Sequence, residues 1–212
     1  VRRQELVDLA EQAGVRVEWM SPEKLTALVG HRRHQDVAAH MAGYPASSLE
    51  EILAQPAAEG RAPWVVLLDQ VVDPQNFGAI VRTAHCAGVD GIVAPKDRSA
   101  PPSPAASKAS AGALEHMRVA YVTNLAAAAQ RLKAQGFWIA GADQEGAQCV
   151  FDADLKGPLA LVVGGEEKGL RPLVKKQCDF TLAIPQTGRI SSLNASAAAA
   201  VIIYEAFRQR RS

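Results

Sequence analysis

Two hydrophobic patterns alternate from Trp64 onward: short continuous apolar runs, and longer segments in which apolar residues recur with helical spacing. The apolar runs predict strands that are buried on both faces of a sheet, at 64–71, 91–95, 119–122, 137–142, 159–165 and 180–185. Helical spacing between and after them predicts helices at 77–87, 105–116, 125–135 and 192–210. Alternating strands and helices indicate an α/β domain with a mostly parallel sheet over residues 63–212.

The first 62 residues show a different pattern. Residues 2–13 have helical spacing, 15–20 alternate like a strand, and Ser21-Pro22 predicts the start of a helix that ends at about Val29. This piece is too small to bury much of a core alone. We therefore expect residues 1–42 to be the remnant of an α/β domain whose beginning is missing. Residues 43–62, rich in proline and glycine, predict a linker that contains a helical turn.

Composition and charge exclude several classes of protein. Hydrophobic residues make up 48% and charged residues 21%, as in ordinary globular proteins. The net charge is +1, which permits a local basic face without requiring one. No apolar run reaches the ~18 residues of a membrane span and no signal peptide is visible, so a cytoplasmic protein is expected. The three cysteines lack metal-site spacing and are predicted to be reduced, partly buried thiols, at Cys86, Cys149 and Cys178.

Ligands of parallel sheets bind beyond the carboxyl ends of the strands, so the loops that follow the predicted strands are the places to search. These loops contain no GxGxxG, no GxxxxGK[ST] and no GxSxG. Their absence counts against dinucleotide-dependent oxidoreductases, P-loop ATPases and serine hydrolases.

Three loops carry unusual residues. In the first, Asn76 occupies the predicted N-cap of a helix, and capping alone would explain it. Arg82 interrupts the apolar pattern of that helix, either as a solvated side chain or as a guanidinium aimed at a phosphate. In the second loop, 162–170, three glycines surround two carboxylates and let the backbone approach a ligand, although a plain turn also uses glycine. In the third, polar residues at 186–194 precede an apolar helix.

Together these loops resemble the three signature motifs of the SpoU (TrmH) family of RNA 2′-O-ribose methyltransferases, within the SPOUT superfamily. The motifs N-x-G-x-x-x-R, G-x-E-x-x-G and I-P-x-x-G-x-x-x-S-L-N-x-S match residues 76–82, 164–169 and 184–196. The resemblance covers essentially the whole chain and is closest to a subgroup that methylates a guanosine ribose in 23S rRNA. One departure is Asp36, which replaces a glycine of that subgroup.

The resemblance implies a parallel sheet with a deep C-terminal trefoil knot, and a partial N-terminal RNA-binding domain with the fold of a ribosomal protein. It also implies S-adenosylmethionine as cofactor, RNA as substrate, a homodimer and no metal. The implied catalytic residues are Arg82, Asn76, Glu166, Ser192 and Asn194. The implied cofactor-binding residues are Gly164, Ile184, Leu193, Gly188 and Thr123.

Methyl transfer from a sulfonium is a direct displacement that requires an oriented nucleophile and no metal. A ribose hydroxyl is a poor nucleophile until its proton is removed or shared. Because a guanidinium stays protonated at neutral pH, Arg82 is favoured as a phosphate anchor and electrostatic aid, with a base role left open. The alternatives are the same reaction on tRNA, a non-catalytic RNA-binding homologue and, less favoured, a nucleotide-dependent oxidoreductase.

Overall fold

The computed structural model describes residues 3–32, 34–41, 43–166, 168–189 and 192–211. The chain divides into two compact units, Val1–Gly43 and Tyr44–Ser212. Among the described residues, no helix is long and apolar enough to span a membrane.

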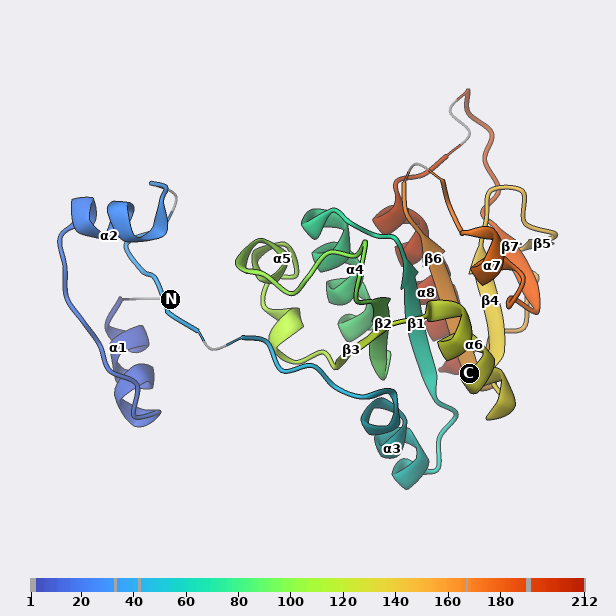
Figure 1. The fold of residues 1–212 in the computed structure, drawn as a ribbon, viewed down its shortest axis with the longest axis horizontal. Coiled ribbons are helices and arrows are strands. Elements are labelled where there is room, and N and C mark those ends of the chain that lie inside the picture. The colour runs from blue at the N-terminus through green and yellow to red at the C-terminus, as the bar shows by residue number, and fades with distance from the viewer. Residues whose placement is uncertain (1–2, 33, 42, 167, 190–191, 212) are drawn as a thin grey trace. The chain divides into compact units, whose positions relative to one another are not determined.

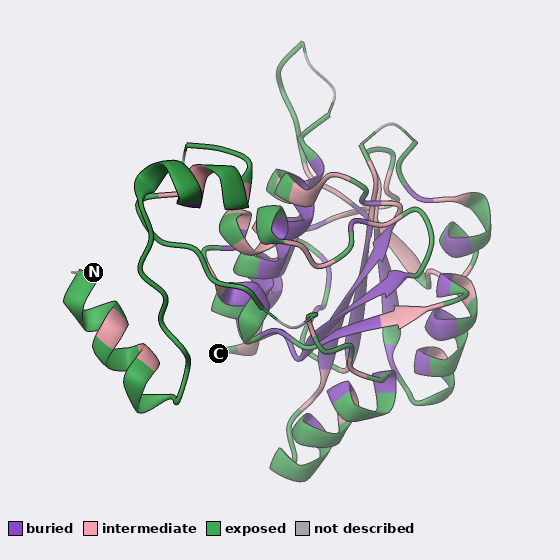
Figure 2. Ribbon diagram, turned by 60° about the vertical axis from the view of Figure 1, so that its left-hand side comes forward, coloured by how far each residue is buried: buried purple, intermediate pink, exposed green. Residues whose placement is uncertain are grey.

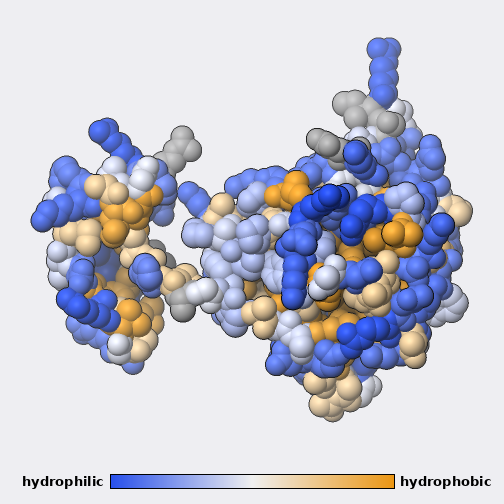
Figure 3. Space-filling view, in the orientation of Figure 1, coloured by the Kyte–Doolittle hydropathy of each residue, from blue (hydrophilic) through white to orange (hydrophobic). Residues whose placement is uncertain are grey.

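The smaller unit contains two helices, α1 (Arg3–Gln12) and α2 (Pro22–Val29), as predicted. The Ser21 side chain caps α2 by accepting a hydrogen bond from the Lys24 N–H, and Gly30, at a φ of 76°, ends it. Residues 15–20 do not form the predicted strand, because no other described segment of this unit pairs with them and a lone strand is not stable in water. Trp19 and Leu28 are exposed. Figure 3 shows apolar patches on the surface of this unit.

Asp36, which stands where the subgroup named above has a glycine, occupies a backbone conformation that suits glycine. Its φ is 60°, in the left-handed region that glycine adopts freely and that aspartate tolerates better than most residues. Its backbone N–H donates to Nδ1 of His34 at 3.1 Å, and its carboxylate pairs with Arg3 at 3.3 Å. The departure at Asp36 therefore keeps the turn and adds an ion pair within this unit.

The larger unit is built on a sheet whose strand order is β3-β2-β1-β6-β4-β7-β5, with parallel pairing throughout the described strands (Figure 1). The central strands are buried along nearly their whole length, which confirms the parallel sheet (Figure 2). Sequence reasoning missed β5, because a two-residue edge strand carries no apolar pattern. The strands are β1 (Trp64–Asp69), β2 (Gly91–Pro95), β3 (Val119–Val122), β4 (Trp138–Ala142), β5 (Gln148–Cys149), β6 (Leu159–Gly164) and β7 (Phe180–Ala183).

Two hydrophobic clusters lie on opposite faces of the sheet. Alternate β1 residues divide between them, Val66 and Leu68 on one face and Val65 and Leu67 on the other, as the two-residue period of a strand requires. The first cluster contains residues of α4 (Pro74–Cys86), α5 (Pro104–Ala109), the short 3-10 helix η1 (Ala113–Glu115) and α8 (Ala195–Arg210). The second contains residues of α3 (Leu49–Glu59), α6 (Leu125–Ala134) and α7 (Pro172–Lys175).

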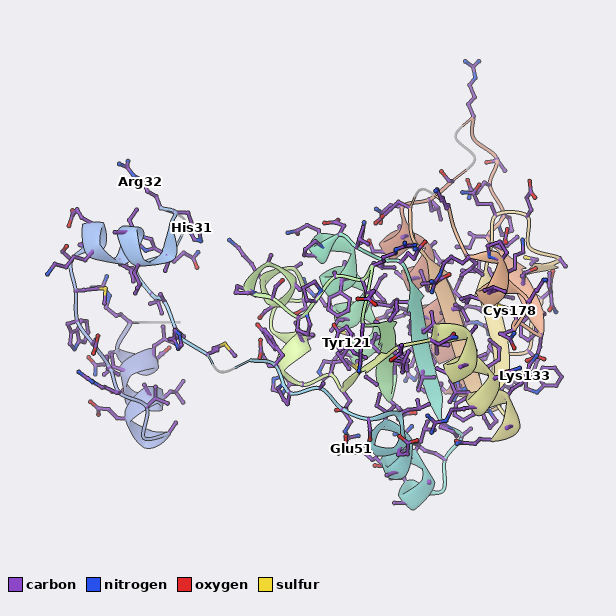
Figure 4. The ribbon with its side chains drawn as sticks, in the orientation of Figure 1. His31, Arg32, Glu51, Tyr121, Lys133 and Cys178 are labelled. Atoms are coloured by element: carbon purple, nitrogen blue, oxygen red, sulfur yellow. The ribbon has the colours of Figure 1, made fainter. Side chains whose placement is uncertain are left out.

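The segment predicted as a linker, 43–62, belongs largely to the larger unit. Its helix α3 is fixed by a reciprocal capping box between Ser48 and Glu51, the latter labelled in Figure 4. Leu49 and Ile52 are buried against the sheet, and the Ser47 N–H donates to the carbonyl of Val119 at 2.9 Å. The linker prediction was wrong here because the apolar face of α3 closes the core beside β3.

Candidate functional site

A cavity of about 620 Å³ opens at the carboxyl ends of β4, β6 and β7, where parallel sheets hold ligands. Its volume suits a small organic ligand. Its walls come from the segments that follow these strands and from the first turns of α8. They are formed by Ala142, Asp143, Gln144, Glu145, Val163, Gly164, Gly165, Glu166, Lys168, Gly169, Leu170, Lys175, Leu182, Ile184, Gln186, Ser192, Leu193, Asn194, Ala195, Ala198 and Ile202.

The glycines after β6 bring bare backbone to this cavity. A Cβ atom on Gly164 would lie 2.5 Å from the carbonyl oxygen of Gly169 and 2.7 Å from the nitrogen of Leu170. The Gly169 N–H donates to the carbonyl of Gly165 at 3.1 Å, so the chain turns back tightly on itself. Glycine is therefore required at Gly164 by close backbone packing, and main-chain groups form this wall.

Asp69, at the end of β1, anchors the far side of the same turn. Its carboxylate is fully buried and accepts hydrogen bonds from the backbone N–H of Arg171 at 2.8 Å and from its Nε at 2.6 Å. The Gly165 N–H also donates to the carbonyl of Asp69 at 2.9 Å. The loop between β6 and α7 is thus held at both of its ends by one residue.

Replacing Asp69 with alanine is expected to lower the free energy of unfolding by about 3–5 kcal/mol, because the Arg171 guanidinium and N–H lose a buried partner. Urea denaturation would measure the loss. The control is Glu50→Ala, which removes an exposed partner of Arg131 and should cost less than about 1 kcal/mol. Equal losses in the two variants would contradict the anchoring role of Asp69.

Asn76 links the head of α4 to the cavity. It was expected at the N-cap, but Asp73 is the cap, since its carboxylate accepts from the N–H groups of Gln75 and Asn76 at 3.1 and 3.3 Å. The buried amide of Asn76 is consequently free to donate from Nδ2 to Oε1 of Glu166, 90 positions away in the sequence. Two predicted catalytic residues are therefore in direct contact.

Arg82 lies on α4 outside the cavity lining. Gly78, one turn earlier, packs closely on α5, where a Cβ would lie 2.5 Å from the carbonyl oxygen of Ala106. The Arg82 side chain is exposed and has no hydrogen bond or ion pair with any residue that the structure describes. Its guanidinium is available to an external anion.

The third polar stretch meets the cavity at the head of α8. Asn194 is the N-cap, and its Oδ1 accepts from the N–H groups of Ser196 and Ala197 at 2.9 and 3.3 Å. Asn194, Ser192 and Leu193 all line the cavity, as does Ile184 after β7. Within the three motifs, Glu167, Ile190 and Ser191 lie outside the described residues.

Two of the predicted cofactor-binding residues are not brought to this cavity. Gly188 is exposed, away from the lining. Thr123 follows β3, the edge strand separated from β6 by β2 and β1, and is also exposed. The neighbouring Tyr121, labelled in Figure 4, donates to the carbonyl of Ala100 at 3.3 Å, and burial raises its pKa to about 12. Thr123 therefore lies at the β3 edge of the sheet, away from the cavity at β4, β6 and β7.

Sequence reasoning missed Asp143 and Lys175, which also line the cavity and form an ion pair of 2.5 Å. Burial would by itself raise the pKa of the Asp143 carboxyl. Hydrogen bonds from Lys175 and from the N–H of Glu145 outweigh this effect and hold that pKa below its ordinary value. Asp143 therefore presents a charged carboxylate at neutral pH. The available signal was its position directly after the strand predicted at 137–142.

The cysteines are free thiols. Cys149 and Cys178 are half-buried as predicted, whereas Cys86 is exposed, because it ends α4 on the side turned away from the sheet. Burial raises the pKa of Cys178 to about 11, so its thiol (labelled in Figure 4) is protonated at neutral pH.

Comparison with known proteins matches two family descriptions to this chain. Residues 63–204 match the SpoU rRNA Methylase family, and residues 2–46 match the RNA 2′-O ribose methyltransferase substrate binding family. The first match contains the whole cavity lining and all three motif loops, and it ends within α8.

Individual relatives agree with these matches. YacO of Bacillus subtilis, assigned to the TrmH family of tRNA/rRNA methyltransferases, is 39% identical over 98% of this chain and 83% of its own length. The 23S rRNA (guanosine-2′-O-)-methyltransferase RlmB of Ralstonia nicotianae is 40% identical over 99% and 83%. The crystal structure of the SpoU methyltransferase AviRb from Streptomyces viridochromogenes, in complex with AdoMet, superposes with a TM-score of 0.72 at 32% identity, covering 79% of this chain and 63% of that one.

Proposed function

The chain belongs to the SpoU family of S-adenosylmethionine-dependent RNA 2′-O-ribose methyltransferases, and on that premise we propose that it methylates a guanosine ribose in 23S rRNA. The observation that carries a catalytic role is the convergence of the three motif loops: Glu166, Ser192 and Asn194 line one cavity, and Asn76 binds Glu166. A non-catalytic homologue would have no need for this convergence. The rRNA substrate is supported by the 40% identity to RlmB.

The cavity fits the cofactor in both size and chemistry. Gly164, Ile184 and Leu193 line it, and main-chain N–H and C=O groups of such residues could read the edge of an adenine. When bound, S-adenosylmethionine supplies a sulfonium methyl group. This chain's residues would hold the nucleoside by backbone contacts, so conspicuous polar side chains are not needed on that wall.

We assign the remaining motif residues to the RNA ribose. Arg82 would bind the phosphate next to the target hydroxyl and stabilise negative charge that develops on its oxygen. Asn76 and Glu166 hold each other, and together fix the head of α4 against the cavity wall. Ser192 and Asn194, which line the cavity at the head of α8, would bind the hydroxyl or the phosphate.

Exposed cations near the carboxyl edge of the sheet support an RNA partner. Arg82, Lys96 and Lys168 follow β1, β2 and β6, and none of them pairs with an acidic group within the described chain. Other cations of this unit, such as Arg131 and Lys133 of α6, are paired with Glu50 and Asp179. Unpaired cations are the groups that displace counterions from phosphates.

We further propose a homodimer, a substrate-binding role for residues 1–42 and a deep trefoil knot at the C-terminal end. The substrate-binding role is supported by the family match over residues 2–46. The knot rests on the resemblance to the SpoU family, and α8, which would follow it, packs on α4 and contacts β4 and β6.

The test is to incubate the protein with methyl-labelled S-adenosylmethionine in two separate reactions, one with unmodified 23S rRNA and one with unmodified tRNA. Label is expected in 23S rRNA, at a guanosine whose 3′ phosphodiester resists alkaline cleavage because its 2′-oxygen is methylated. Label in tRNA alone would overturn the rRNA assignment. Binding of either RNA without methyl transfer would favour the non-catalytic alternative.

A further inference from the structure

The acidic side chains that line the cavity differ in how far they are committed to other contacts. Glu166 is bound by Asn76, and Glu145 is exposed to solvent. The side chain of Asp143 is only 17% exposed, and it lies directly after β4. It is the one described acid of the lining that combines burial with a place at the end of a central strand.

Asp143 is also held rigidly. Its N–H donates to the carbonyl of Leu182 at 3.0 Å, which fixes it to β7, and its carbonyl accepts from the Gly146 N–H at 3.1 Å. A Cβ on Gly146 would lie 2.5 Å from the carbonyl carbon of Leu182, so this turn is pressed against the strand. Oδ1 accepts from the Glu145 N–H at 2.9 Å, and Oδ2 lies 2.5 Å from Nζ of Lys175. The carboxylate is therefore oriented before any ligand arrives.

A carboxylate offers about four acceptor positions, and these two contacts leave about two of them free. Two adjacent hydroxyl groups can use both at once, and a carboxylate placed after a strand recognises a ribose in this way in dinucleotide-binding folds. We propose that Asp143 accepts hydrogen bonds from the 2′- and 3′-hydroxyls of the cofactor's ribose, with Lys175 holding the carboxylate charged and in position. The proposal rests on the placement of the cofactor in this cavity and is independent of the RNA substrate.

The test measures binding by calorimetry without RNA, with S-adenosylhomocysteine and its 2′-deoxy analogue as ligands. The wild-type protein should bind the deoxy analogue about 10-fold or more weakly, because a site built around a hydroxyl is left with an unpaired group. Asp143→Ala should bind S-adenosylhomocysteine about 10- to 100-fold more weakly and should no longer distinguish the two ligands. Asp143→Asn keeps one acceptor oxygen, so its affinity for S-adenosylhomocysteine should lie between those of the wild type and Asp143→Ala.

Asp152→Ala is the matched control, since it removes an exposed aspartate outside the cavity lining and should leave both affinities and their ratio unchanged. Discrimination that survives in a folded Asp143→Ala variant would overturn the proposal. A second result would also overturn it: an Asp143→Ala variant that no longer distinguishes S-adenosylhomocysteine from an analogue without the α-amino group. Asp143 would then bind the ammonium of the methionine part and not the ribose. Absence of binding to the wild-type protein would reject the cavity assignment itself, whereas a wrong RNA assignment would change none of these results.

Discussion

Arg82→Ala is expected to reduce the single-turnover rate of methyl transfer to RNA by about 10²-fold or more, while cofactor affinity changes by less than about twofold. The two effects separate because the Arg82 side chain is exposed and lies outside the cavity lining. Removing it takes away an oriented charge for the RNA phosphate and leaves the cofactor walls unchanged. Arg82→Lys should recover part of the rate, since it keeps the charge but not the bidentate geometry of a guanidinium.

The control for this experiment is Arg131→Ala, which removes another exposed arginine from α6 and should leave the rate near that of the wild type. Near-normal methylation by Arg82→Ala would show that the phosphate-anchor assignment is wrong. A parallel fall in cofactor affinity would indicate instead that Arg82 stabilises the cavity.

The sheet was predictable because its strands are covered on both faces. Runs such as Trp64–Asp69 are apolar at nearly every position. A strand needs such a run only when both of its faces are buried, as they are in a parallel sheet covered by helices. The same logic fails where burial is one-sided or brief. Helix α3 was placed in a linker although Ser48 and Glu51 carry a capping-box spacing, because the surrounding prolines and glycines dominated the interpretation.

The site was predictable to the extent that motif residues lie in loops after strands. The contact of Asn76 with Glu166 was not, since it depends on β1 and β6 being neighbours, and no local pattern states strand order. Asp73, and not the predicted Asn76, is the N-cap of α4, with Pro74 at the first helical position, so Asn76 is free to bind Glu166. Asp143 was missed because a single aspartate after a strand is common, and only its contact with Lys175 and its place in the cavity distinguish it.

A cofactor held mainly by backbone groups offers few side chains to delete, so the sharpest test of its position is to fill the cavity. Gly164 is unsuitable, because any side chain there would collide with the backbone of Gly169 and disturb the loop. Ala198 lines the cavity from α8, whereas Ala197 beside it is exposed and outside the lining. Ala198→Phe is therefore expected to weaken binding of S-adenosylhomocysteine by more than about 100-fold, because the ring occupies space that the nucleoside needs.

Ala197→Phe adds the same ring to the same turn of α8 and should change the affinity by less than about twofold. Calorimetry would give both affinities, and thermal unfolding would show whether the two variants remain equally folded. If both variants bound the ligand as the wild type does, the nucleoside would have to lie elsewhere on the protein. If both lost binding equally while folded, the effect would belong to α8 as a whole. Only a difference between two adjacent alanines would locate the cofactor in the cavity at the carboxyl ends of β4, β6 and β7, which Gly164 and Asp143 also line.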